Sequence, residues 1–497
     1  MSNFTDERFV EQSSIEKRSW KGLSALLVGA QAVTSVMFLI SLITMNIISG
    51  FWIAVVIAVL VVLLGFSAIK LLLQNKVSTI TKVICEIISV ACIAGTIVAF
   101  RYTSAFNGFV NKITNRKETK EYSVMVMEDS GINEVKGLAD KNVGFLKIDE
   151  KVGNAEQYLQ TLVKFTPQFY DDVETLTGVL TGKIVDSIVL ETDRLEMLKE
   201  DAADSIKNTK VIYTFEIELE SENAEIVTKE VTEEPFILYI SGTDSRAGVK
   251  ATARSDVNIL AVVNPKQGKI LLVSIPRDTY VQLHGTTGIK DKLTHAGVYG
   301  INMSKTTIED FLGINIDYTV KVSFDTVTRV VDQIDGVEIN SDTDLTLSAW
   351  SKTDPKKTCH YIVGKQMVDG DCALRFARER KSYERGDRHR GENQMEVITA
   401  IVNKLSGSKN YLLKLPSILD IAADSFETSL TKDNITAFIR MQLNDGINWK
   451  TESISVDGAG SMQGTYSMGA GRPLYVMLAY PESVAEAQSK IREYLTK

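Results

Sequence analysis

The densest group of chemically informative residues is a run of arginines in the last third of the chain. The segment from Ala373 to Gln394 reads ALRFARERKSYERGDRHRGENQ, with arginine at positions 375, 378, 380, 385, 388 and 390 and a single lysine, Lys381, among them. A solvated basic surface would mix the two residue types, whereas arginine is favoured where its planar guanidinium holds an oxyanion through two parallel hydrogen bonds. The segment therefore predicts a phosphate-binding site.

Spacing within this segment suggests how its side chains share faces. Arg390 and Gln394 are four residues apart and lie on one face if they are helical. Arg378 and Arg380 are two apart and share a face if they are extended. Asp387 stands among the arginines. Because neighbouring cations lower the pKa of a carboxyl group, we expect Asp387 to be ionised, as a proton acceptor or simply as a charge partner.

Further polar residues stand beside predicted strands. Asp244 follows one strand, Arg254 and Asp256 precede the next, and Arg277 follows a third. Ligands of open α/β sheets bind beyond the carboxyl ends of strands. One or two carboxylates together with phosphate oxygens are the usual ligands of protein-bound Mg²⁺. Asp244 and Asp256 are therefore the predicted metal ligands, for Mg²⁺ or alternatively Mn²⁺, against the simpler interpretation of turn or cap chemistry.

Composition places these residues outside a nucleic-acid context. The 497 residues carry a net charge of -8, so the basic segment is a local feature and no nucleic-acid partner is expected. A chain of this length can form two or three domains.

The N-terminal region predicts a membrane anchor. No charged residue occurs from 22 to 69, which fits two spans joined near Asn46, and a third span is expected at 80–103. Lysines and arginines precede the first span and link the second to the third: Lys17, Arg18, Lys21, Lys70, Lys76 and Lys82. The positive-inside rule then makes residues 1–21 a cytoplasmic tail and puts everything beyond 104 outside the cell.

The four cysteines are divided between these regions. Cys85 and Cys92 fall in the third span, where we expect them to pack as small apolar residues. Cys359 and Cys372 lie in the exterior part, where a disulfide could persist, but their spacing alone does not establish one. No cysteine or histidine spacing indicates a zinc site.

The exterior part reads as two α/β regions. Residues 104–230 are expected to form a polar stalk (104–122) and a small α/β accessory domain, with strands at 122–127, 142–146 and 184–190 and helices at 155–163, 170–180 and 192–202. A glutamate-rich linker or edge segment follows at 214–234, and we found no catalytic constellation in this region. From 235 to 497, alternating strands and helices predict an α/β sandwich with a mixed central sheet.

Four ordered motifs carry a resemblance to a known family. They are GTDSR at 242–246, ARSDVNILAVVNPKQGKILLVSIPRDTYV at 253–281, KLTHAGVYG at 292–300 and VDGDCALRFARERKSYERGDRHRGENQ at 368–394. Together they resemble the LytR-CpsA-Psr family over about 235–497. Three N-terminal spans and an additional exterior domain resemble its capsule-cluster, CpsA-type members from Gram-positive bacteria.

The resemblance implies a phosphotransferase in the cell membrane that moves capsular polysaccharide from undecaprenyl diphosphate to peptidoglycan through a phosphodiester link. It gives Asp244 and Asp256 the Mg²⁺ role and Asp387 the position of the base, with Arg378 and Arg380 as catalytic residues. It assigns the pyrophosphate to Arg254, Arg277, Arg378, Arg380, Arg390 and Gln394. Its implied partners are the lipid-linked glycan, peptidoglycan, the bilayer and other capsule-assembly proteins.

Two alternatives use the same residues. A polyprenyl-pyrophosphate hydrolase would admit water in place of the acceptor hydroxyl. A non-catalytic regulator of capsule assembly would bind polyprenyl phosphate without turnover.

Overall fold

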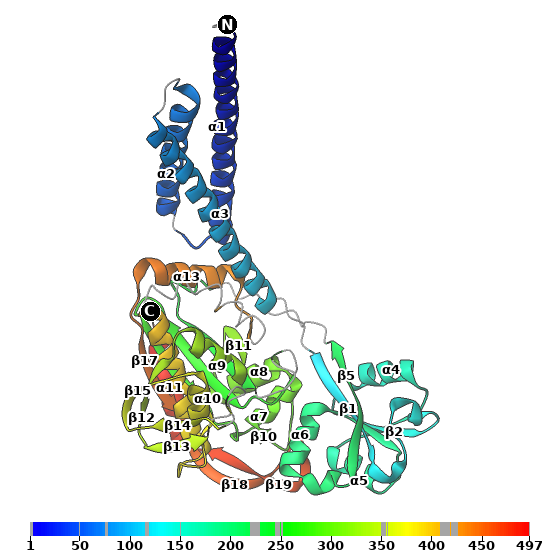
Figure 1. Cartoon of the computed structure of the whole chain (residues 1–497). Helices are drawn as coiled ribbons and strands as arrows, with labels where there is room; N and C mark the ends of the chain where they lie inside the picture. Colours follow the sequence, from blue (N-terminus) through cyan, green and yellow to red (C-terminus); the bar gives the residue numbers. More distant parts are fainter. Residues whose placement is uncertain are drawn as a thin grey trace. The chain divides into compact units, whose positions relative to one another are not determined.

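The structure is a computed structural model that describes residues 3–48, 50–74, 78–114, 119–149, 151–218, 229–243, 249, 252–348, 354, 356–407, 418 and 426–496. It divides into two compact units (Figure 1). The first comprises 1–111, 415–420 and 432–446, and the second the remaining residues.

The first unit contains the apolar helices that the sequence predicts. Helix α1 is Asn3–Met45, α2 is Gly50–Ala68 and continues as a π-helical turn to Leu73, and α3 is Thr79–Thr114. Within the described residues, 22–45, 50–73 and 79–114 are long and apolar enough to cross a membrane. Asn46, at the predicted turn, has φ +53°, which asparagine tolerates better than most residues.

Polar side chains join α1 to α3. The Ser89 hydroxyl donates to Gln31 Oε1 at 3.1 Å, and the Thr96 hydroxyl donates to the carbonyl oxygen of Thr34 at 3.0 Å. Side-chain hydrogen bonds and small residues are the usual means of holding apolar helices together where both partners face hydrocarbon. These contacts give the uncharged polar residues of the apolar segments a structural role.

Helix α3 extends into the segment that was predicted as a stalk. Helix α3 does not end near 103 but continues to Thr114, because Phe106, Val110 and Ile113 repeat at helical spacing and are each 1% exposed. Helix α13, Lys432–Asp445, also belongs to this unit, and Lys432 Nζ donates to Asn107 Oδ1 at 2.8 Å. The leucine-rich helices predicted beyond 410 fall largely outside the described residues.

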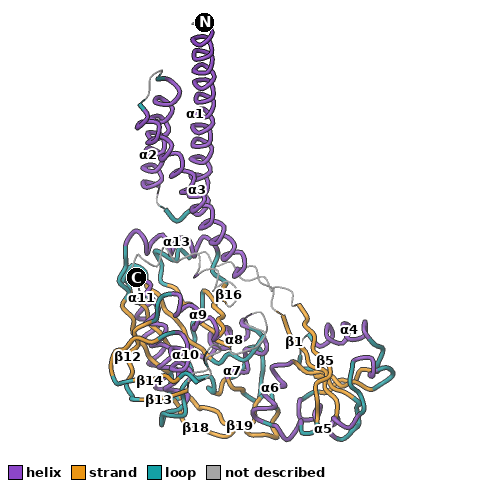
Figure 2. Tube along the Cα trace, in the orientation of Figure 1, coloured by secondary structure: helices purple, strands orange, loops and turns teal. Residues whose placement is uncertain are grey.

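The accessory region is a five-stranded mixed sheet ordered β3-β2-β4-β1-β5 (Figure 2). Its strands are β1 Thr119–Met127, β2 Asn142–Leu146, β3 Thr166–Tyr170, β4 Ser187–Glu191 and β5 Thr209–Glu218. Its helices are α4 Val152–Leu162, α5 Val173–Thr181 and α6 Thr192–Asp201. One face packs on α4, and the other on α5 and α6.

One predicted helix boundary in this region is corrected. Residues 166–170 form β3, and the helix begins after it, because the Asp172 side chain caps the chain by accepting from Thr175 N at 2.7 Å. The segment from Thr214, predicted as a linker or edge segment, begins in β5, the edge strand of the sheet, which pairs with β1 and confirms the second alternative for these residues.

The C-terminal region is built on a six-stranded mixed sheet ordered β16-β11-β6-β7-β8-β17. Its bounds are β6 Phe236–Thr243, β7 Val257–Asn264, β8 Lys269–Ser274, β11 Tyr318–Ser323, β16 Phe426–Thr428 and β17 Lys450–Ser455. Strand β7 is buried throughout, as a central strand covered on both faces should be. The predicted turn at 264–268 is present, with Gly268 at φ +60°.

Helices cover both faces of this sheet, which confirms the predicted α/β sandwich (Figure 1). On one face, α8 (Ile301–Leu312) and α14 (Pro481–Leu495) close a core that includes Tyr239, Leu260 and Leu271. On the other face lie α9 (Phe324–Gln333), α10 (Gly370–Arg378) and α11 (Asp387–Ser406). A Cβ at Gly391 would meet Ser274 Oγ at 2.4 Å, so α11 sits very close to β8.

Short antiparallel strand pairs complete the region. They are β9 Tyr280–Val281 with β10 Asp291–Lys292, β12 Val337–Ser341 with β15 Gly364–Val368, β13 Leu345–Ser348 with β14 Thr358–Tyr361, and β18 Gly458–Thr465 with β19 Gly469–Ala479. Cys359 of β14 and Cys372 of α10 form a disulfide, with Cα atoms 5.5 Å apart. The pairing left open by the spacing is therefore present.

Candidate active site

A pocket of about 700 Å³ gathers most of the predicted phosphate ligands. Basic residues from three separate segments line it: Arg254, Arg277, Arg375, Arg378, Arg380, Lys381 and Arg390. They come from the loop before β7, the segment after β8 and the α10–α11 region. The sheet thus assembles one cationic surface from positions more than a hundred residues apart.

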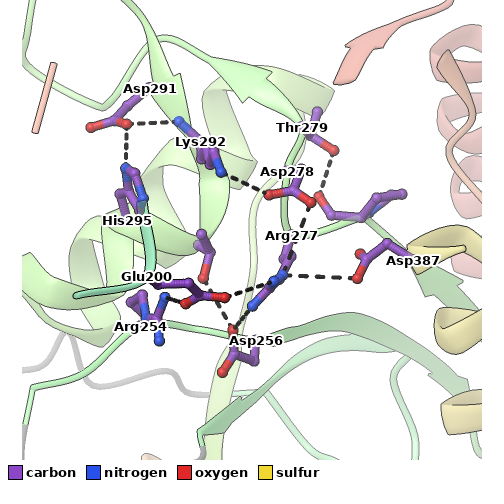
Figure 3. A network of polar contacts seen from close by, with 12 residues as sticks. Glu200, Arg254, Asp256, Arg277, Asp278, Thr279, Asp291, Lys292, His295 and Asp387 are labelled. Carbon is purple, nitrogen blue, oxygen red and sulfur yellow. Dashed lines mark hydrogen bonds and ion pairs between the residues drawn. The ribbon is translucent and has the colours of Figure 1, made fainter. Parts of the chain in front are cut away.

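Arg277 is at the centre of the polar network shown in Figure 3. Its Nη1 lies 2.7 Å from Asp256 Oδ1, and its Nε lies 3.8 Å from Asp387 Oδ1 and 4.0 Å from Asp278 Oδ2. Its Nη2 lies 3.8 Å from Glu200 Oε1. The Arg277 side chain is 12% exposed, so carboxylates take the place of water around its guanidinium.

Asp256 remains ionised in this setting. Burial raises the pKa of its carboxyl group, but the charges of Arg277, Arg254 and Arg390 outweigh burial and hold the pKa below its usual range. The Thr294 hydroxyl is a further, long contact, 3.5 Å from Asp256 Oδ1.

The pKa of the Asp387 carboxyl group differs from the prediction. Its Oδ1 lies 2.5 Å from Arg390 Nη2, yet the pKa of its carboxyl group is raised, not lowered. Burial is the largest cause and the nearby Asp278 charge adds to it, while Arg390 and Arg277 only partly compensate. The sequence shows the flanking cations but not the burial. A carboxylate with a raised pKa is a better proton acceptor near neutral pH.

Arg378 and Arg380 both line the pocket, but not for the predicted reason. Arg378 is the last residue of α10, so the two residues are not part of one extended segment. The Arg378 guanidinium carbon lies 4.9 Å from the ring centre of Phe324, an arrangement that orients a planar cation. Arg380 lies in the loop after the helix and lines the same pocket.

Arg390 and Gln394 lie on α11, one helical turn apart, as their spacing predicts. Arg390 lines the pocket. Gln394 is 8% exposed, and its Nε2 atom has no hydrogen-bond partner among the described residues. Its assignment to the pyrophosphate stays a prediction.

The remaining arginines of the run have acidic partners of their own. Arg375 Nη2 lies 2.5 Å from Glu379 Oε2, and Arg385 Nη1 lies 2.6 Å from Glu392 Oε1. Arg388 pairs with Asp457, at the start of the β18–β19 hairpin region. The arginine run is therefore not one uniform phosphate cluster.

The structure describes one of the two predicted metal ligands, Asp256. Asp244 lies outside the described residues. Asp256 is ionised and lines the pocket beside the cations that would hold phosphate. Within the described residues no group of three or more His, Cys, Asp or Glu forms a metal cluster. One carboxylate fits a cation that takes its other ligands from phosphate and water.

The KLTHAGVYG segment, residues 292–300, contacts the polar network around Arg277. Lys292 Nζ lies 3.4 Å from Asp278 Oδ1 (Figure 3). The buried Asp291 accepts from Ser467 N at 2.8 Å, and its Oδ1 lies 2.6 Å from His295 Nδ1. These contacts hold the strand that carries Lys292, and so position Asp278 near Arg277.

Sequence reasoning missed the acidic wall that the accessory domain adds to the pocket. The pocket is lined by Glu121, Asp193, Glu196 and Glu200, although no catalytic constellation was found in the sequence of the accessory domain. Burial, with repulsion from Glu191, raises the pKa of Asp193 to about 7. No local motif marks these residues, because their proximity to the arginines depends on how the two domains pack.

Comparison with known proteins gives the same assignment as the motifs. The family model described as the LytR_cpsA_psr family matches residues 198–478. A TagU polyisoprenyl-teichoic acid–peptidoglycan teichoic acid transferase from Halalkalibacterium halodurans is 30% identical over 266 residues, covering 53% of this chain and 80% of that protein. The TagU of Bacillus subtilis is 34% identical over 203 residues, covering 41% of this chain and 62% of that protein.

Among solved structures, Bacillus subtilis TagV is 26% identical and superposes with a TM-score of 0.43, covering 53% of this chain and 98% of TagV. The family match spans more than half of the present chain and includes the described pocket arginines. This chain belongs to the LytR-CpsA-Psr family.

Proposed function

We propose that this chain is a phosphotransferase that moves a capsular glycan from an undecaprenyl-diphosphate carrier onto peptidoglycan. The observation that carries the proposal is the convergence of Arg254, Arg277, Arg378, Arg380 and Arg390 on one pocket beside two carboxylates, Asp256 and Asp387. The curated relatives are named as transferases of teichoic acid to peptidoglycan. Capsular polysaccharide as the cargo is the finer part of the proposal.

The proposed reaction exchanges one phosphoester bond for another. The acceptor hydroxyl of peptidoglycan attacks the phosphorus that carries the glycan. The bond from this phosphorus to the bridging oxygen breaks, and undecaprenyl monophosphate leaves. The product is a phosphodiester, and the hydroxyl proton passes to the Asp387 carboxylate, whose raised pKa suits this task.

The arginines act on the charge that develops during this exchange. Negative charge grows on the leaving bridging oxygen and is spread over the equatorial oxygens of the transferred phosphoryl group. Guanidinium groups held in place by buried carboxylates can stabilise this charge without reorganising. Arg277, with its fixed contact to Asp256, and Arg378, stacked on Phe324, are built for that role.

We further propose Mg²⁺, or Mn²⁺, as the cofactor. Asp256 would hold it, with Asp244 as the second carboxylate. When bound, such an ion neutralises charge on the diphosphate oxygens.

The proposed location is the cell membrane, with a cytoplasmic N-terminus and the second unit outside. The three apolar helices and the distribution of lysine and arginine around them support this topology. A cysteine introduced near Ser221 should react with a membrane-impermeant thiol reagent in intact cells. Labelling that needs cell lysis would contradict the orientation and with it the proposed reaction.

The decisive assay combines purified chain, undecaprenyl-diphosphate-linked glycan and peptidoglycan. We expect glycan linked to peptidoglycan through a phosphodiester, together with undecaprenyl monophosphate. Arg378→Ala should abolish both products, whereas Arg492→Ala, on the exposed face of α14, should leave them unchanged. Release of glycan phosphate that does not need peptidoglycan would favour the hydrolase, and binding without any product would favour the regulator.

A further inference from the structure

Helix α6 of the accessory domain is clamped onto the catalytic region by a buried arginine. Arg194 has 0% exposure and lies 2.6 Å from Glu191 Oε2 through its Nε. Its Nη1 donates to the carbonyl oxygen of Ser467 at 2.9 Å, and its Nη2 donates to the Tyr299 hydroxyl at 3.4 Å. A fully buried charge with this many partners holds its helix in one position.

Apolar packing continues the same contact. Leu195 and Leu198 of α6 share one buried cluster with Val298, Met468 and Leu474 of the catalytic region. An interface with an apolar core and a buried ion pair is a fixed part of the fold. The α6 side chains that line the pocket are therefore a fixed part of it.

Glu200, near the end of α6, makes the closest approach to the phosphate-binding arginines. Its Oε2 accepts a hydrogen bond from Arg254 Nη1, and its Oε1 lies 3.8 Å from Arg277 Nη2 (Figure 3). The Arg254 and Arg277 side chains are 21% and 12% exposed, so these guanidinium edges have limited access to water. The two oxygens of one carboxylate thus bridge two predicted pyrophosphate ligands.

We propose that Glu200 is an internal competitor for the anion site, and that it determines which phosphate-bearing ligands this site accepts. The inference rests on the proposed function, because it takes Arg254 and Arg277 as ligands of the diphosphate. Glu200 occupies the donor edges that phosphate oxygens would take. A ligand must displace its carboxylate or bind against its charge.

The competition discriminates by charge and reach. A single inorganic phosphate only replaces the Glu200 carboxylate by another anion, so it gains little binding free energy at Arg254 and Arg277. A polyprenyl diphosphate brings two phosphate groups and can also reach Arg378, Arg380 or Arg390 across the pocket, so it can displace Glu200. Glu200 then keeps the site closed to small anions while it admits the lipid-linked diphosphate.

Burial and charge agree with this assignment. Burial would raise the pKa of Glu200, but the hydrogen bond and charge of Arg254, with the charge of Arg277, lower it below its usual range. The carboxylate is therefore charged at neutral pH and competes as an anion. Its 42% exposure leaves it room to swing away when a ligand enters.

The test is equilibrium binding of geranyl diphosphate and of inorganic phosphate to the full chain in detergent. Glu200→Gln keeps the size of the side chain and removes its charge. We expect it to tighten geranyl diphosphate binding by about 10-fold, since close ion pairs at binding sites contribute at this level. Inorganic phosphate binding should tighten by more than this, so selectivity for the diphosphate should fall.

The matched control is Asp171→Asn. It removes one carboxylate from an ion pair of the same domain, 2.8 Å from Lys147 Nζ, but away from the pocket. Its affinities should equal those of the wild type. Unfolding curves of both variants show whether a change in binding comes from a damaged fold, and Glu200→Ala repeats the test if Glu200→Gln is unstable.

The outcomes separate the inference from the proposed function. Equal affinity in Glu200→Gln and wild type, or weaker binding in Glu200→Gln, would overturn the inference, the latter by showing that Glu200 only positions the arginines. Equal tightening of both ligands would also overturn it, because selectivity would then not depend on Glu200. If wild type and both variants fail to bind geranyl diphosphate at all, the proposed function fails with it.

Discussion

Arg277 and Asp256 form a largely buried ion pair, Nη1 to Oδ1 at 2.7 Å, between the segment after β8 and the loop before β7. Neighbouring strands in the sheet bring these residues together. The pair leaves the remaining guanidinium nitrogens of Arg277 directed at Asp387, Asp278 and Glu200. One arginine thus connects the predicted metal ligand, the predicted base and the accessory domain.

The first prediction concerns Asp256. Asp256→Asn removes the negative charge that pairs with Arg277. It also removes the carboxylate of the proposed metal site that lies within the described residues. We expect turnover to fall on the order of 100-fold, as for loss of a preorganised electrostatic group, and its dependence on Mg²⁺ to weaken. Steady-state assays over a range of Mg²⁺ concentrations measure both. Wild-type turnover with an unchanged metal response would show that the site is misplaced.

The second prediction concerns the geometry of Arg378. Arg378→Lys keeps the positive charge but loses the planar fork and its stacking on Phe324. Turnover should fall nearly as far as in Arg378→Ala, on the order of 100-fold. The assay is transfer of glycan to peptidoglycan by the purified variants. A fully active lysine variant would indicate a diffuse cationic surface and not a fitted diphosphate site.

The third prediction concerns the pH dependence of catalysis. The raised pKa of Asp387 means that the group loses its proton at a higher pH than an ordinary aspartate. A general base must be unprotonated, so turnover should decline as pH falls through this raised value. Asp387→Asn should lose turnover and retain geranyl diphosphate binding. An acidic limb of the same position in Asp387→Asn would assign the titration to another group.

The fourth prediction concerns stability and Asp193. Its folded pKa of about 7 lies above the ordinary value of 3.8, so the folded state binds more protons between these limits. The Asp193 contribution to stability is therefore fully present below about pH 4 and is lost as pH rises towards 7. Asp193→Asn should unfold at a temperature less dependent on pH across this window.

Thermal unfolding of both proteins from pH 4 to 8 tests this, and the difference in Tm should grow by a few degrees or more towards pH 7. Parallel curves would mean that Asp193 titrates normally.

The fifth prediction concerns the domain clamp. Arg194→Ala leaves Glu191 without this partner and removes two contacts to the catalytic region. We expect a loss of about 3–5 kcal/mol in the free energy of unfolding, as for breaking a buried ion pair. Denaturant unfolding measures it, with the exposed Arg492→Ala as control. A change below that of the control would show that packing alone holds the domains.

The sequence by itself determined the features that depend on composition and local order. The uncharged apolar run was enough to predict the apolar N-terminal helices, and the short apolar runs at 236–240 and 257–263 were enough to predict strands β6 and β7. The segment 373–394, rich in arginine and poor in lysine, predicted a phosphate-binding site. The structure does bring Arg254, Arg277, Arg378, Arg380 and Arg390 to one pocket.

Tertiary structure decided the properties that depend on distance and burial. The pKa of Asp387 is raised because packing buries it, which its cationic neighbours in the sequence conceal. Arg388 forms an ion pair with Asp457, whereas Arg378 lies over the ring of Phe324, although the two arginines belong to the same arginine run. Glu200 reaches Arg254 only because Arg194 and an apolar core hold α6 in place, and no local pattern encodes a contact between residues this far apart in the chain.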